Sequence, residues 1–349
     1  MLVLPFNRTE SQAAASYALF GKLPNRPDFV RINANHPAAI EFDDLIQRSF
    51  ERWSAVPDWE SGYEALEPVD FQYLSRDQRH VLVGVLKPSR DQAGRRYPMV
   101  AAAILPSESI DTYGAVSPIA YEVFYDGLRE QVGNAIDNSV EALSCRQFLE
   151  DQLRNQESAA ADLELAESVV GRFMATQGAG RLNDLLMAAK KPATLPQALL
   201  NIVFYLAHLR RFDHPATNQI VVLPLSGNKG EQALVASSWL SLLSALGWVK
   251  GSHNLWRGSY LFLRQPEGGS QLVVSLGRMP DGFFGALLGG VFDPRLVLDL
   301  AEPQEAWKSH RLYAEVSYAL GRLLADPACR LAELQDFLKG VGQQLDEVN

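Results

Sequence analysis

The stretch FGKLPNRPDFVR, residues 20–31, precedes the first strongly helical part of the chain. Gly21 frees the backbone at this point, whereas Pro24 and Pro27 restrict it. The polar residues between two aromatic ones indicate an ordered surface loop rather than a disordered segment. Residue chemistry alone therefore predicts a shape here and no reaction.

The composition is that of a folded, water-soluble protein. The chain has 349 residues, of which 47% are hydrophobic and 21% are charged, enough for one large domain or two ordinary ones. A formal net charge of -9 argues against general binding to nucleic acids or anionic membranes. The apolar runs are well short of the roughly 20 residues that span a bilayer, and the first residues lack a signal-peptide pattern. Two cysteines without CxxC spacing suit a reducing compartment, so we expect a cytoplasmic protein.

Periodicity predicts both helices and strands. Residues 38–53 predict a helix that starts at Pro37, with an apolar face formed by Ile40, Ile46, Phe50 and Trp53. Further helices are expected over residues 118–189, 194–212, 231–246, 304–325 and 331–345. Strands are expected over residues 71–74, 81–86, 99–105, 219–225, 259–264 and 271–276, with a hairpin turn at 267–270.

This order of elements predicts an α/β fold in which a mixed β-sheet lies between helices as a three-layer sandwich. The predicted main domain covers residues 1–300, with an internal junction near 190–195. A helical C-terminal extension over residues 301–349 follows it.

No motif in the sequence predicts catalysis or a cofactor. The turn at residues 226–230 resembles a phosphate loop, but its Lys229 precedes the last glycine and so breaks the Walker spacing; an ordinary turn is favoured. The histidines show no metal-ligand spacing and are His36, His80, His208, His214, His253 and His310. Cys145 lies in a helical pattern, which is more typical of a packed thiol than of a nucleophile. We therefore expect no catalytic residues, no metal site and no cofactor.

Two charged groups invite a functional interpretation. Glu41, Asp43 and Asp44 could form a carboxylate pair, although the outer face of a surface helix explains them better. Residues 87–98 form a basic connection between two predicted strands. Its arginines could bind carboxylates or phosphates of a partner, or could pair internally with Asp91 or Asp28. Both alternatives remain open.

Residues 21–31 and 84–98 together resemble the TagF (ImpM) family of type VI secretion-associated proteins. Two long motifs in the same order make the resemblance specific, and a looser similarity at residues 270–288 extends it to roughly residues 17–293. The predicted domain over residues 1–300 is therefore TagF-like. Pro27 departs from the family pattern, which has glycine there, so the first motif is expected to take a different backbone shape.

The resemblance implies a cytoplasmic, non-enzymatic protein that restrains assembly of a bacterial type VI secretion system after translation. It implies binding to the forkhead-associated scaffold protein of that system, without nucleic acid or membrane insertion. Some family members carry a phosphatase domain, whose aspartate-rich metal-binding segments we do not find here. Candidate partner-binding residues from the two motifs are Lys22, Arg26, Asp28, Phe29, Arg31, Asp91, Arg95, Arg96 and Tyr97. Alternative functions are a small-ligand or phosphate-responsive sensor and a structural component of the secretion baseplate.

Overall fold

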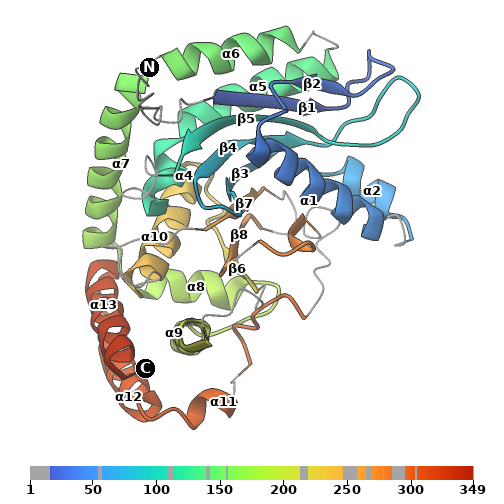
Figure 1. Ribbon diagram of the computed structural model, residues 1–349. Coiled ribbons are helices and arrows are strands. Elements are labelled where there is room, and N and C mark those ends of the chain that lie inside the picture. The colour runs from blue at the N-terminus through green and yellow to red at the C-terminus, as the bar shows by residue number, and fades with distance from the viewer. Residues whose placement is uncertain are drawn as a thin grey trace, which may run out of the picture.

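A computed structural model describes most of the chain (Figure 1). The described residues are 16–53, 57–107, 114–138, 142–154, 156–212, 219–246, 258–264, 269–277, 279–284, 295–302 and 305–348. Most of the hairpin turn predicted at 267–270, and the end of the helix-like similarity beyond residue 284, lie outside them.

In the part of the chain that the structure describes, eight strands form one sheet in the order β2-β1-β5-β4-β3-β7-β8-β6. Their bounds are β1 Ser16–Gly21, β2 Val30–Ile32, β3 Val69–Leu74, β4 His80–Lys87, β5 Met99–Pro106, β6 Ile220–Pro224, β7 Tyr260–Leu263 and β8 Gln271–Ser275. The pairings between these strands are antiparallel. Within the described residues, parallel pairing occurs at one bridge, between Ile220 and Val297.

The helices lie on both sides of this sheet and below it in Figure 1. Their bounds are α1 Pro37–Trp53, α2 Trp59–Glu64, α4 Ser117–Ala120, α5 Glu122–Asp137, α6 Leu143–Arg154, α7 Gln156–Thr176, α8 Gly180–Ala188, α9 Leu195–Phe212, α10 Gln232–Ala245, α11 Glu305–Lys308, α12 Tyr313–Leu324 and α13 Leu331–Val348. The predicted layered α/β fold is therefore confirmed. The short connections between β3, β4 and β5 make hairpins, which is why this part of the sheet is antiparallel.

Alternating side chains of each central strand pack on opposite layers. In β1, Ala18 and Phe20 pack in the same cluster as Phe42 of α1. Tyr17 and Leu19 point to the other face and pack in the cluster that contains the buried residues of α5 and α6. Because both faces are covered, β4 and β5 read as continuous apolar runs, as the sequence predicted.

Helix α1 begins at Pro37, as predicted, and Ile46 and Phe50 of the predicted apolar face pack in the core, but Ile40 does not. Ile40 is 43% exposed, whereas Phe42 is fully buried. Phe42 stacks on Phe71 of β3 with ring centroids 4.5 Å apart. The face that packs on the sheet is therefore turned by part of a helical turn from the one that Ile40 suggested.

The β7-β8-β6 part of the sheet packs against α10, whose residues are mostly buried. Trp239 lies at its centre and donates from Nε1 to the Pro224 carbonyl at 3.0 Å. Helix α13 packs against α7, α9 and α10, and its Leu334 and Leu338 are fully buried in the same core. The predicted helix at residues 304–325 is divided into α11 and α12. The domain boundaries at 300 and near 190–195 stay predictions.

Strands β3 and β7 join the two parts of the sheet, with Asp70, Phe71 and Gln72 paired to residues 260–262. Asp70 is 1% exposed. Arg264 pairs with its carboxylate at 2.7 Å, and Arg129 of α5 pairs with it as well. The junction thus contains a buried carboxylate whose charge two guanidinium groups compensate.

Candidate functional site

The two stretches of the family resemblance lie side by side at one end of the sheet. We call residues 20–31 the first signature loop, residues 87–98 the second signature loop, and their common exposed face the signature surface. Because β1 pairs antiparallel with β5, both loops leave the sheet at the same end. Ser89 Oγ donates to the Lys22 carbonyl at 2.6 Å, which links the loops directly.

Gly21 permits the close approach of the loops. Its φ is +134°, a conformation that favours glycine, and a Cβ placed on it would lie 2.1 Å from the Pro98 carbonyl oxygen. Beyond this contact, the Gln92 N–H donates to the Arg26 carbonyl at 2.9 Å. The first motif therefore requires glycine at this position for packing as well as for backbone conformation.

Asp91 is the polar centre of the signature loops. Its side chain is completely buried, and it pairs with Lys22 Nζ at 3.1 Å and Arg95 Nε at 2.7 Å. It also accepts from the backbone N–H groups of Ala93 and Arg95. Burial alone would raise the pKa of Asp91, but these donors outweigh it and lower the pKa to about 2. Arg95 Nη2 reaches on to the Pro27 carbonyl at 2.9 Å, so the ionised Asp91 holds both loops together.

Asp43 of α1 forms a second contact point beneath the loops. It pairs with Arg31 at 2.6 Å and accepts from the hydroxyl of Tyr97. The Arg31 guanidinium also lies 4.9 Å from the centre of the Phe29 ring. Tyr97 packs between Phe29 and Phe50, and its burial together with the neighbouring Asp43 raises its pKa. Each signature loop is thus attached to the same carboxylate of α1.

Helix α2 holds the second signature loop from the side. Arg96 Nη2 pairs with Glu64 at 2.7 Å, and its guanidinium lies 5.9 Å from the Trp59 ring. The Tyr63 hydroxyl donates to the Ser89 carbonyl at 3.0 Å and accepts from the Ser89 N–H at 2.9 Å. Burial raises the pKa of Tyr63, so this hydroxyl stays protonated.

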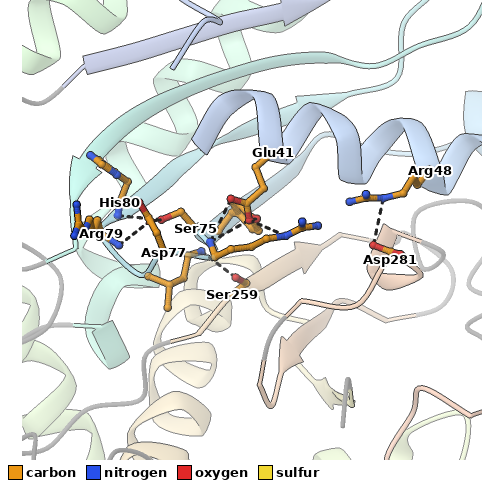
Figure 2. Close-up of polar contacts among 11 residues, drawn as sticks. Glu41, Arg48, Ser75, Asp77, Arg79, His80, Ser259 and Asp281 are labelled. Atoms are coloured by element: carbon orange, nitrogen blue, oxygen red, sulfur yellow. Dashed lines mark hydrogen bonds and ion pairs between the residues drawn. The ribbon is translucent and has the colours of Figure 1, made fainter. Parts of the chain in front are cut away.

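A further polar cluster joins α1 to the β3–β4 turn (Figure 2). Glu41 accepts from the Arg76 N–H at 3.0 Å and from the hydroxyl of Tyr73. Asp77 closes the turn by accepting from Ser75 Oγ at 2.6 Å. Figure 2 also shows Arg48, further along α1, directed towards Asp281.

These contacts correct the interpretation of the α1 carboxylates. The charge pattern predicted an outer face for Glu41, Asp43 and Asp44, but Asp43 is 8% exposed and Glu41 contacts the turn. Asp44 alone of the three is exposed. A helical wheel with Ala39 and Ile46 on the apolar face also places Asp43 there, and this is the signal in the sequence for its burial.

The first residues of α1 are capped by a histidine. His36 Nδ1 accepts from the Ala38 N–H at 3.2 Å, and its ring meets that of His80 edge-on at 4.6 Å. Burial and the neighbouring His80 lower the pKa of His36, against the opposing effect of Asp77. The cap therefore depends on a neutral imidazole.

The candidate residues fall into two groups by exposure. Lys22, Asp91 and Tyr97 mainly support the loops, whereas Arg26 and Asp28 are exposed. Side-chain exposure is 53% for Arg31, 64% for Arg95 and 30% for Arg96, although each also has an internal partner. Phe29 is partly buried under Arg31. Internal pairing thus accounts for Arg95 and Arg96, and partner binding stays a prediction.

The turn at residues 226–230 is an ordinary capped turn. The Asn228 N–H donates to Ser226 Oγ at 3.1 Å, and the Gly230 N–H donates to Asn228 Oδ1 at 3.1 Å. Glu231 reaches Ser226 Oγ at 3.2 Å and adds a negative charge beside it. These donors are satisfied internally, which removes the main support for a phosphate loop.

Metal and thiol chemistry find no support in the described residues. They contain no group of three or more His, Cys, Asp and Glu side chains that could hold a metal ion. His214 and His253 lie outside them. Cys145 and Cys329 are buried, and burial raises the pKa of Cys145 to about 11, so its thiol is protonated near neutral pH. None of the described helices is long and apolar enough to cross a membrane.

Comparison with known proteins identifies the part of the chain that carries both loops. Residues 18–152 match the TagF N-terminal domain, a family described as type VI secretion system-associated. This part of the chain is similar to a TagF N-terminal domain. The match extends from β1 to α6 and includes both signature loops, but it is shorter than the range 17–293 that the resemblance suggested.

Two further comparisons add little to this TagF assignment. The crystal structure of PA0076 from Pseudomonas aeruginosa PAO1 is 14% identical, and the alignment covers 80% of this chain and 96% of that one with a TM-score of 0.41. No curated protein is significantly similar in sequence. The TagF domain is therefore what connects this chain to type VI secretion.

Proposed function

We propose that this type VI secretion-associated protein is a non-enzymatic regulator that binds the forkhead-associated scaffold protein and so restrains assembly of the secretion machine. The signature surface is the contact region. The TagF match supports the secretion system, and the family resemblance supports the direction of regulation and the partner.

The observation that carries the binding role is the charge of the signature surface. The two loops contain seven Lys and Arg residues and two Asp residues, a formal net charge of +5. Asp43, Glu64 and Asp137, which lie outside the loops, pair with Arg31, Arg96 and Lys87, so the positive excess of the surface is smaller than this but remains. The whole chain carries -9, so all remaining residues together carry -14. A basic surface on an acidic protein favours an acidic partner and disfavours self-association through the same face.

The support beneath this surface suits binding better than catalysis. Asp91, Asp43 and Glu64 each have an arginine partner and maintain the shape of the loops. A surface held in its binding conformation loses little conformational entropy when a partner docks.

The test is a titration of the purified chain with the scaffold protein of the same secretion cluster, phosphorylated and unphosphorylated. We expect saturable binding to both forms that weakens as the salt concentration rises. Arg26→Glu should weaken binding about tenfold, because it reverses an exposed charge of the signature surface.

Arg172→Glu is the matched control, since it makes the same charge change on the exposed side of α7. Equal losses of affinity for Arg26→Glu and Arg172→Glu would mean that binding depends only on the net charge of the chain. Absence of binding to either form of the scaffold would refute the proposed function.

A further inference from the structure

A groove separates the first signature loop from the start of α6. Its volume is about 480 Å³. The apolar part of its lining consists of Leu23, Phe29, Val30, Ile32, Ala142 and Leu143. Leu143 is 57% exposed, which is unusual for a leucine and places an accessible apolar side chain at the edge of the groove.

The edge strand β2 forms the floor of the groove. Strand β2 lies at one end of the strand order, and within the described residues it pairs with β1 alone. Its other edge therefore offers backbone N–H and C=O groups to a further strand. Val30 and Ile32 pack towards the α5–α6 layer, whereas Arg31 turns to Asp43 on the other face. An added strand would thus lie with every second side chain facing the groove.

The charge beside the groove favours an acidic occupant. Arg26 and Arg146 line the groove together with one carboxylate, Asp28. Arg146 Nε also pairs with Glu150 at 2.8 Å, so the charges of these four residues balance. The second signature loop supplies the positive excess: its Gln92 N–H and Arg95 Nη2 hold it against Arg26 and Pro27 of the groove lining, and its own formal net charge is +3.

We propose that the groove binds an extended, acidic segment of a partner protein, which adds as a strand to the free edge of β2. Apolar side chains of the segment contact Leu143, Val30 and Ile32, and its carboxylates lie near Arg26 and Arg146. Backbone hydrogen bonds to β2 supply affinity, and the alternation of apolar and acidic side chains supplies specificity. This inference deepens the proposed function and takes the scaffold protein as its natural partner.

The probe is a fluorescent octapeptide of alternating glutamate and valine, titrated with the full chain and followed by fluorescence anisotropy. We expect saturable binding, with at least tenfold weaker binding of the lysine–valine and glutamate–serine octapeptides. Two further glutamate–valine peptides carry N-methyl groups on alternate peptide nitrogens, at the odd positions in one and at the even positions in the other. One of the two should not bind, because every second N–H group of an added strand faces β2.

A substitution in the groove tests the location. Leu143→Ser should weaken binding of the glutamate–valine peptide by about fivefold or more, because it removes the exposed apolar contact. Leu165→Ser is the matched control on α7, where Leu165 is 64% exposed and lies outside the groove lining. A larger loss for Leu165→Ser than for Leu143→Ser would overturn the proposal, as would full binding of both methylated peptides or no binding at millimolar concentration.

The outcomes also separate this inference from the proposed function. A scaffold protein that binds the chain normally when Leu143→Ser is present would contradict the groove and leave the regulator intact. A peptide that binds as described, with a scaffold protein that does not bind at all, would support the groove and refute the scaffold as its partner.

Discussion

A buried aspartate holds the signature surface together. Asp91 receives four donors from two loops that are about 65 residues apart in sequence, and Asp43 connects both loops to α1. Such a carboxylate stabilises the structure only while it is ionised, since the protonated form cannot pair with Lys22 and Arg95 in the same way. The shape of a basic loop can therefore depend on a buried acidic residue.

Asp91→Asn should lower the thermal unfolding midpoint by several degrees, because the amide leaves Lys22 and Arg95 without a charged acceptor. The matched control is Asp44→Asn, an exposed position on α1 that should change the midpoint little. A midpoint for Asp91→Asn within experimental error of the wild type would show that the ion pairs do not stabilise the loops.

The loss of stability caused by Asp91→Asn should depend on pH. The folded-state pKa of Asp91 is about 2, below the ordinary value of 3.8. Its stabilising effect is therefore complete above about pH 4 and is lost as the pH falls towards 2. We expect the difference in free energy of unfolding between wild type and Asp91→Asn to shrink over this range in denaturant titrations. A difference that stays constant would contradict the assignment.

His36 introduces a second pH dependence near neutrality. Its folded-state pKa is lowered from the ordinary 6.5, so the cap of α1 is fully stabilising above that value and weakens as the pH falls below it. His36→Asn keeps a capping side chain that does not titrate. Wild-type stability relative to this variant should therefore decrease between pH 7.5 and pH 5, measured by urea unfolding.

His310→Asn controls for the loss of a capping imidazole, because His310 Nδ1 accepts the corresponding bond from the Leu312 N–H at 3.2 Å. Its ring lies beside Phe204 rather than a second histidine. If the free energies of unfolding of wild type and of His36→Asn changed in parallel with pH, titration of the His36 cap would be excluded.

At the scale of elements, the strands from β5 to β6 in the sheet order could be predicted, and the two at the other end, β1 and β2, could not. Strands β4 and β5 carry apolar runs because both faces are covered, and such runs are visible in the sequence. Strand β2 has three residues with a charged one in the middle, and β1 runs directly into the first signature loop, so neither was predicted. The pairing of β1 with the distant β5, and of β2 with β1, follows from tertiary contacts, which a local pattern does not contain.

The candidate site, too, could be predicted only in part. The two loops could be named from the sequence because their motifs are continuous. Their supports, Asp43 and Glu64, come from helices whose relation to the loops depends on the packed fold. Phe42 rather than Ile40 faces the sheet for the same reason, since the neighbours of a helix select its buried face.

The close approach of Gly21 to Pro98 predicts that alanine costs more stability at Gly21 than at Gly94. Gly21→Ala should destabilise the chain by about 3 kcal/mol or more, because the new Cβ meets the Pro98 carbonyl and the backbone conformation is unfavourable. Gly94→Ala is the control, since Gly94 has a φ of +81° but nothing within 4 Å of the added Cβ. It should cost about 1 kcal/mol. Chemical unfolding measures both, and equal costs would show that the loops do not pack as closely as described.

At the scale of the whole molecule, the last helices contribute to the main core. The buried leucines of α13 belong to the cluster that also contains α9, α10 and the β7-β8-β6 strands. Leu338→Ala should therefore destabilise the protein by about 2–5 kcal/mol. Calorimetry should show this as a shift of the transition that unfolds α10, with the exposed Tyr318→Ala of α12 as control. A separate early transition, with the remainder unchanged, would instead mark residues 301–349 as an independent extension.

The junction between β3 and β7 has a consequence for synthesis on the ribosome. The strands β2-β1-β5-β4-β3 all precede residue 107 and can assemble first, but β3 waits for β7 while about 190 further residues are translated. At roughly 5–20 residues per second this takes about 10–40 s. During that interval the outer edge of β3 is open to neighbouring nascent chains, and Asp70 places a charge at the first of the three positions that later pair with β7. The carboxylate that two arginines neutralise in the finished fold is thus suited to keep growing chains on one messenger from pairing with each other.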